Sequence, residues 1–154
     1  MNRRMGIYAV ALASSAIEVN PLASFVVIPL MAVFMGSELE KSIYSPKFQR
    51  ETAWMLLALA ALEGFTGFAA GPVTSNIISK ATFGLMTRGL GLELHLILID
   101  PLALFFILHI ASGIGLSLIR RGIRAAVIYK AIIPAALIAA FALIVYLNSL
   151  FFFG

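Results

Sequence analysis

The sequence predicts an all-α, polytopic transmembrane helix bundle. Three observations lead to this prediction: the composition is strongly apolar, the apolar residues fall in long runs, and the basic residues lie between the runs. Of the 154 residues, 62% are hydrophobic and 12% are charged, whereas soluble domains average about 45–50% and about 25%. Too few charged residues remain to cover a soluble protein of this size. Lipid is therefore the expected solvent for most of the chain.

Residues 1–154 are expected to form a single membrane domain. A helix needs about 20 apolar residues to cross a bilayer. Four apolar runs are candidate spans: Met5–Met35, Thr52–Ala70, Leu90–Ile119 and Ala125–Phe153. The second run fits one crossing and the fourth fits one long or tilted crossing. The first and third are too long for one straight span and short for two.

Each of the two longest runs contains an amide or acid followed by proline, at Asn20-Pro21 and at Asp100-Pro101. Asn and Asp are favoured helix N-caps, and proline is favoured at the first helical position. The residue before proline is also biased away from helical geometry. The pattern predicts helix breaks at Pro21 and Pro101, so each long run is either a tight hairpin or one span broken in its middle.

The number of spans depends on residues 71–88, a weakly apolar segment that carries Lys80. Cytoplasmic loops of membrane proteins carry an excess of Lys and Arg. If this segment crosses the membrane, the chain has seven spans and the basic clusters lie on one side of the membrane. If it does not, the chain has six spans and its two halves have inverted orientations. The sequence therefore predicts an integral protein of the cytoplasmic or plasma membrane, with six or seven short spans and a cytoplasmic N-terminus.

The two longest runs also align with each other, because Pro-Leu-Ala and several apolar residues match. One interpretation is a duplicated three-helix unit with Pro-broken helices, with halves 1–72 and 80–154 joined by a linker at 72–84. Chance similarity between two apolar segments is the other interpretation. In repeat-built transporters, binding sites lie at broken helices between the repeats.

The element Glu-x-Asn-Pro-Leu at Glu18–Leu22 follows a short apolar helix. It resembles the corresponding element of a family of small uncharacterised multi-pass membrane proteins, the DUF5658 family. The resemblance covers about Tyr8–Met35, and the second copy of the element has Leu98 in place of the glutamate. It implies a compact membrane bundle without an assigned role.

Ionisable residues inside a bilayer are costly unless they are paired or wetted, so each one is a functional candidate. Glu63 lies near the middle of the second run, with no basic residue within a helical turn. Its carboxyl is either hydrogen-bonded inside the bundle or forms a proton or cation site, unless the register leaves it at an interface.

Glu18, Asn20, Glu93 and Asp100 complete the candidate pathway residues. Asn20 and Asp100 have a structural explanation as helix caps, and Glu18 suits a water-facing position at the membrane edge. If the breaks instead lie at mid-membrane, freed carbonyl oxygens and these carboxylates would make an oxygen-rich cation site.

Several kinds of chemistry have no support in the sequence. The chain has no cysteine, which excludes disulfides and thiolate sites. The spacing of His95 and His109 is familiar from haem-binding helices, but Pro101 interrupts the run between them and no third histidine exists. No metal motif such as HExxH and no nucleophile motif occurs. The sequence therefore predicts no cofactor and no metal, and it favours a non-enzymatic role without excluding an intramembrane enzyme.

The net charge of +4 is carried by short clusters between apolar runs, which favours lipid over nucleic acid as the partner. Arg120, Arg121 and Arg124 suit anionic head groups. Two functions remain open. One is a small transporter or ion-conducting bundle, in which the intramembrane acids line a path for a small cation or solute. The other is an accessory subunit without chemistry of its own, packed inside a larger membrane protein complex. The expected protein partners are accordingly further copies of the chain, as a homo-oligomer, or the subunits of such a complex.

Overall fold

The computed structural model describes residues 43–153, and this part of the chain consists of helices joined by turns. Five helical segments follow one another: α3 (Pro46–Ala70), α4 (Ser75–Ala81), α5 (Arg88–Arg120), the π-helix η3 (Ile128–Ile132) and α6 (Ile133–Phe153). Three helices are long and apolar enough to cross a membrane, namely α3, α5 and the continuous stretch Ile128–Asn148. The all-helical fold is thus confirmed for the described residues and is compatible with a membrane bundle, whereas a total of six or seven spans is not confirmed.

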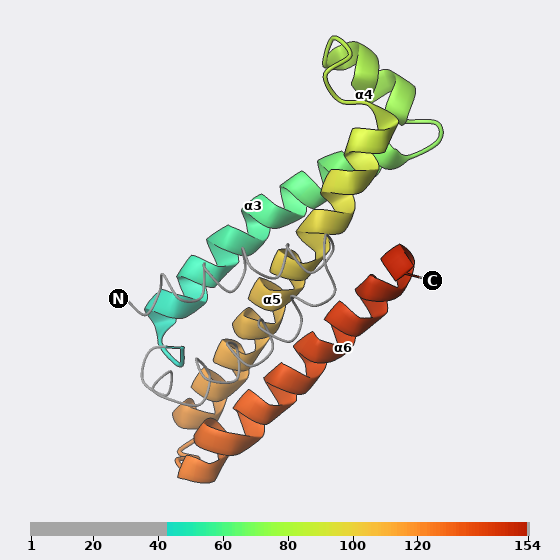
Figure 1. Ribbon diagram of the computed structural model, residues 1–154. Coiled ribbons are helices and arrows are strands. Elements are labelled where there is room, and N and C mark those ends of the chain that lie inside the picture. Colours follow the sequence, from blue (N-terminus) through green and yellow to red (C-terminus); the bar gives the residue numbers. More distant parts are fainter. Residues whose placement is uncertain (1–42, 154) are drawn as a thin grey trace, which may run out of the picture.

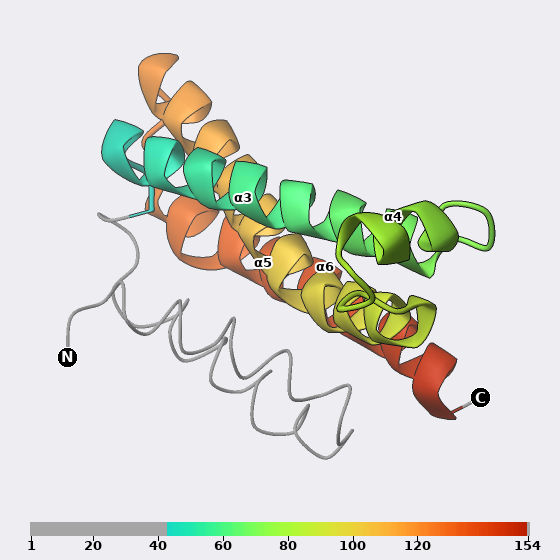
Figure 2. The same ribbon diagram turned by 90° about the horizontal axis from the view of Figure 1, so that it is seen from above.

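The three long helices lie side by side, with α5 between α3 and α6 (Figure 1). Successive long helices run in opposite directions along the bundle. The short helix α4 lies at the end of the bundle where α3 is joined to α5 (Figure 2). The opposite end holds the start of α3, the end of α5 and the start of α6. These two ends are called the α4 end and the basic end below, because most of the described Lys and Arg residues lie at the second.

Helix α3 begins six residues before the apolar run that predicted it. The side chain of Ser45 accepts a hydrogen bond from the amide of Phe48 at 3.2 Å, and Pro46 occupies the first turn. Both are favoured start features of helices. The helix ends at Gly71, whose amide bonds back to the carbonyl of Gly67 at 3.1 Å. Pro72 follows and cannot continue the helix.

The predicted helix break at Pro101 is wrong. Helix α5 runs without interruption from Arg88 to Arg120 with Pro101 inside it, so Asp100 is not an N-cap and the third apolar run is a single helix. Membrane helices tolerate internal proline because neighbouring helices help to satisfy the freed backbone groups. Pro101 is buried, and α3 and α6 both pack on α5. Packing therefore outweighs the local preference of the Asp-Pro pair.

Residues 71–88 do not form a span. The segment contains the seven-residue helix α4 and two turns, and a helix of this length is far shorter than a bilayer. The predicted linker 72–84 is therefore partly helical. The first apolar run, the break at Asn20-Pro21 and the resemblance at Glu18–Leu22 lie outside the described residues. The duplication into halves 1–72 and 80–154 accordingly stays a prediction.

Close packing at two glycines brings neighbouring segments onto α5. A Cβ atom added to Gly91 would lie 2.7 Å from the Cβ of Ala69, and one added to Gly115 would lie 2.1 Å from the ring of Tyr44. In lipid, such small residues allow helices to approach closely. The core beside them contains large side chains from α5 and α6, among them Leu104, Leu108, Leu137, Phe141 and Val145.

Candidate functional site

Asp100 is the most deeply buried acid of the described residues, with 0% of its surface exposed. Its Oδ1 atom accepts a hydrogen bond from Nδ2 of Asn148 at 3.2 Å, which ties α5 to α6. Its Oδ2 atom is also buried and has no hydrogen-bond partner within residues 43–153. A buried acceptor without a partner is costly, so Oδ2 is the atom of this pair that could take a proton or a cation.

Glu63 forms a second pair, with His95, between α3 and α5. Nδ1 of His95 lies 3.2 Å from Oε1 of Glu63 and 3.2 Å from its backbone oxygen. Both neighbours are acceptors, so Nδ1 carries the hydrogen in this arrangement. The Oε2 atom of Glu63 is buried without a hydrogen-bond partner in the described part of the chain. About a third of the His95 side chain is exposed, so this pair reaches the surface of the bundle.

His109 forms a third polar cluster, nearer the basic end. Its Nε2 lies 3.0 Å from Nε2 of Gln49, which can only donate. Its Nδ1 lies 2.9 Å from Oγ1 of Thr52, and the Thr52 hydroxyl donates to the carbonyl of Phe48 or Gln49. The contacts therefore suit an imidazole that accepts at Nε2 and donates from Nδ1.

The three clusters lie on two sides of α5. His95 and His109 contact α3, whereas Asp100 contacts α6. The structure thus brings Glu63 together with His95 but does not bring Asp100 into the same site. Along the axis, Asp100 lies five residues from His95, or about 7.5 Å at the rise of an α-helix. Passage between the two carboxyls would have to go around α5.

The remaining candidate residues are dispersed. Glu93 is exposed near the start of α5, two residues before His95. Arg120, Arg121 and Arg124 are exposed at the basic end, where they are available to head groups. Glu18, Asn20 and Pro21 lie outside the described residues.

Sequence reasoning missed the partners Gln49, Thr52 and Asn148. Gln49 precedes the apolar run Thr52–Ala70 that predicted α3, so the apolar pattern contains no indication that it lies inside the bundle. A spacing pattern could have indicated two of these residues: Gln49 and Thr52 precede Glu63 and Thr66 by the same interval that separates His95 from His109. Asn148 could have been indicated as a buried polar partner because it is an amide inside the long apolar run Ala125–Phe153.

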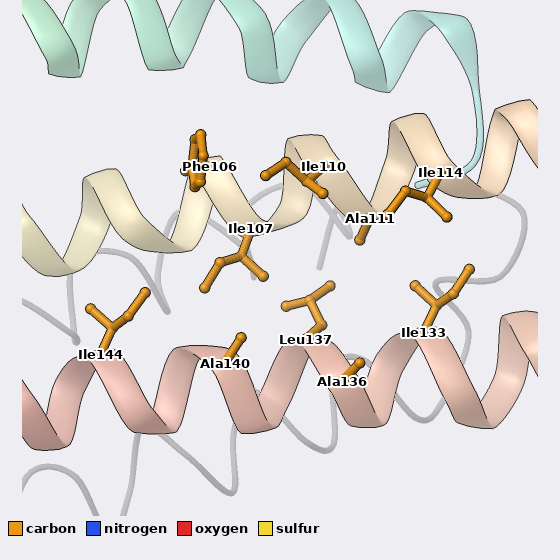
Figure 3. Close-up of a pocket in the computed structure, with 10 residues that line it drawn as sticks. All are labelled: Phe106, Ile107, Ile110, Ala111, Ile114, Ile133, Ala136, Leu137, Ala140 and Ile144. Atoms are coloured by element: carbon orange, nitrogen blue, oxygen red, sulfur yellow. The ribbon is translucent and has the colours of Figure 1, made fainter.

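A groove of about 370 Å³ lies between α5 and α6. All of the residues that line it are apolar, and Ile107 and Leu137 point toward each other across it (Figure 3). On the α6 side, Ala136 and Ala140 are small and exposed. The groove offers space to a lipid chain or a further helix but no group that could do chemistry.

Within residues 43–153, no cluster of three or more His, Cys, Asp or Glu side chains could hold a metal ion. His95 and His109 are each engaged with groups of α3. The expectation that the protein works without a cofactor stays a prediction.

The described residues thus form an all-helical bundle with three helices apolar enough to cross a membrane, and polar side chains join these helices inside the bundle. Comparisons of the chain with protein-family models, with curated proteins and with solved structures found no match. The function therefore has to be argued from the polar groups themselves.

Proposed function

We propose that the protein is a small membrane transporter that moves protons or a small monovalent cation, with Asp100 as the binding group. The observation that carries this proposal is the state of the Asp100 carboxyl. It is fully buried in α5, the longest helix of the described part of the chain, and Asn148 engages one of its two oxygens while the other has no partner among residues 43–153. An acid at such a place is costly in a bilayer, and intramembrane acids mark ion and proton pathways.

Glu63 and His95 support the same proposal. Their pair has the same arrangement, with one carboxylate oxygen engaged and the other buried without a partner in the described region. The partial exposure of His95 makes this pair the group that exchanges a proton or cation with the α4 side. Because Asp100 faces α6, transfer between the two acids would need intervening water or a rotation of α5.

The proposal is tested with the purified protein in proteoliposomes under an imposed proton, sodium or potassium gradient. Asp100→Asn keeps the size of the side chain and its bonding capacity toward Asn148, and we expect it to abolish the flux. Glu51→Gln removes one acid near the start of α3 and serves as the control, with flux like that of the unaltered protein. Flux of an Asp100→Asn variant equal to that of the unaltered protein would refute the role of Asp100.

An accessory subunit is the second candidate, and one specific observation favours it. The groove between α5 and α6 is lined only by apolar side chains and has small alanines on one wall, a surface against which a helix of another subunit could pack. This role predicts that the chain is isolated from native membranes only together with other polypeptides. Ion flux from the chain reconstituted alone would exclude a purely structural role.

A further inference from the structure

The connection between α3 and α5, residues 71–87, exposes its largest apolar side chains. Phe83 is 95% exposed and Leu85 is 79% exposed. Val73, two residues before α4, and Ile77 within α4 form a second exposed apolar strip. Single exposed apolar residues are ordinary, whereas several in one short connection mark an interaction site.

The backbone holds Phe83 at the tip of this connection. Its φ angle of 53° lies in the left-handed region, which bulky residues rarely adopt. Hydrogen bonds maintain the turn: the amide of Phe83 donates to Lys80 O at 3.2 Å, and the amide of Gly84 donates to Ser79 O at 2.7 Å. Unfavourable backbone geometry that the surroundings hold in place tends to occur at functional positions. Here it keeps the aromatic ring away from the bundle.

The two spans that flank the connection place it at one surface of the bilayer. The apolar run Thr52–Ala70 in α3 is about 28 Å long at the rise of an α-helix, close to the thickness of the hydrocarbon core. Nε of Arg88 donates to the carbonyl of Ala70 at 3.2 Å, so α5 begins at the level where α3 ends. Residues 71–87 therefore lie where the hydrocarbon gives way to head groups.

The charge of the segment suits this position. Within residues 71–87 the one Lys or Arg is Lys80, and Arg88 follows directly at the start of α5. Both side chains are exposed. Long basic side chains can lie along apolar surface while their charged ends reach the head groups. Asn76 and Lys80 form a polar strip on α4 beside the apolar strip, the pattern of helices that lie in the membrane interface.

We propose that residues 71–87 form an interfacial anchor, in which Phe83 and Leu85 insert between the head groups and the acyl chains of the adjacent leaflet. Asn76 and Lys80 face the head groups. The anchor sets the depth of the α3–α5 pair in the bilayer, and with it the depth of Glu63 and His95. This inference depends on the spans and not on transport, so either proposal can fail without the other.

The experiment uses tryptophan as a depth probe. The chain has one tryptophan, Trp54, and Trp54→Phe makes the background silent. Phe83→Trp, Leu85→Trp and Asn76→Trp are then reconstituted separately into phosphatidylcholine vesicles brominated at shallow or deep acyl positions. We expect Phe83→Trp and Leu85→Trp to emit at shorter wavelength than Asn76→Trp. Shallow bromines should quench their fluorescence more than deep bromines, and aqueous iodide should quench it little.

Asn76→Trp is the matched control, because it lies in the same connection on the polar strip, and iodide should quench it strongly. Leu85→Trp keeps the test valid if a change at the unusual backbone of Phe83 disturbs folding. Two outcomes would overturn the proposal. Quenching of both apolar probes by iodide and not by bromine would place the connection in water. Protection from both quenchers would show that a protein partner or a second copy covers it.

Discussion

At Gly91 and Gly115, single residues determine how closely other segments can approach α5. Helix α3 packs against Gly91 through Ala69, and the ring of Tyr44 fills the space over Gly115. Any larger residue at either position would have to displace a neighbour. Gly89 differs, because an added Cβ atom there would meet nothing within 4 Å. A larger residue should thus be tolerated at Gly89 but not at Gly91, although both lie near the start of α5. Sequence alone cannot distinguish these two glycines.

Gly91→Ala should lower the stability of the bundle, because the new methyl group would lie 2.8 Å from the carbonyl carbon of Ala69, and overpacking typically costs about 1–3 kcal/mol. Gly89→Ala should leave stability unchanged or raise it by up to about 1 kcal/mol through helix propensity. Thermal denaturation of both variants in detergent checks the prediction. Equal melting temperatures for the two variants would contradict the close approach at Gly91.

At the scale of the element, two polar clusters fix the register of α3 against α5. His95 meets Glu63 and His109 meets Gln49 and Thr52. Sliding one helix past the other by a single turn would separate both histidines from their partners. In a bilayer no water is present to replace those bonds, so the clusters select one alignment of two helices whose apolar surfaces alone would allow several.

A double-mutant cycle measures this coupling. Thr52→Val and His109→Phe, made singly and together, should show a favourable interaction energy, which for side-chain bonds between membrane helices averages about 0.6 kcal/mol and reaches about 1.7 kcal/mol. Unfolding in mixed detergents is a suitable measurement. Thr66→Val combined with His109→Phe is the control, and these two changes should be additive because Thr66 donates to carbonyls of its own helix. If the effects of Thr52→Val and His109→Phe are additive, the Thr52–His109 bond does not stabilise the bundle.

The apolar runs predicted α3 and the last span well, because run length directly reflects the thickness of the bilayer. The Asp100-Pro101 pair led to the wrong prediction of a helix break, because capping rules describe a helix in isolation and α5 is held by neighbours on both sides. The partners of the polar residues were not accessible at all: Asn148 is 48 residues from Asp100, and His109 is 60 residues from Gln49. Such pairs depend on which faces meet, and apolar periodicity is weak in helices that are apolar all round.

Over the whole molecule, the charges are unevenly divided between the two ends. Of the Lys and Arg residues in the described region, two lie at the α4 end, Lys80 and Arg88. The others lie at the basic end: Lys47, Arg50, Arg120, Arg121, Arg124 and Lys130. Because Lys and Arg concentrate on the cytoplasmic side, we infer that the basic end faces the cytoplasm and that the proposed anchor lies in the opposite leaflet.

Single-cysteine labelling tests this orientation, and the natural absence of cysteine gives a clean background. In intact cells, a membrane-impermeant maleimide should label Asn76→Cys at the α4 end. It should label Ala125→Cys, in the loop before η3, only after the membrane is opened. The reversed pattern would show that charge does not set the orientation of this bundle.

Ile43 and Tyr44, just before α3, are held by residues far along the chain. Ser112 donates to the carbonyl of Ile43, and the Tyr44 hydroxyl donates to the carbonyl of Tyr129 at 3.2 Å. The Tyr129 ring also meets the Tyr44 ring edge-on at 5.2 Å between centroids. During synthesis the Ser112 contact can form once α5 has been made, whereas the Tyr44 contacts with Tyr129 cannot form until the ribosome has passed residue 129. The junction in front of α3 is therefore only partly fixed while α3 and α5 are inserted, and the arrival of the last helix completes it.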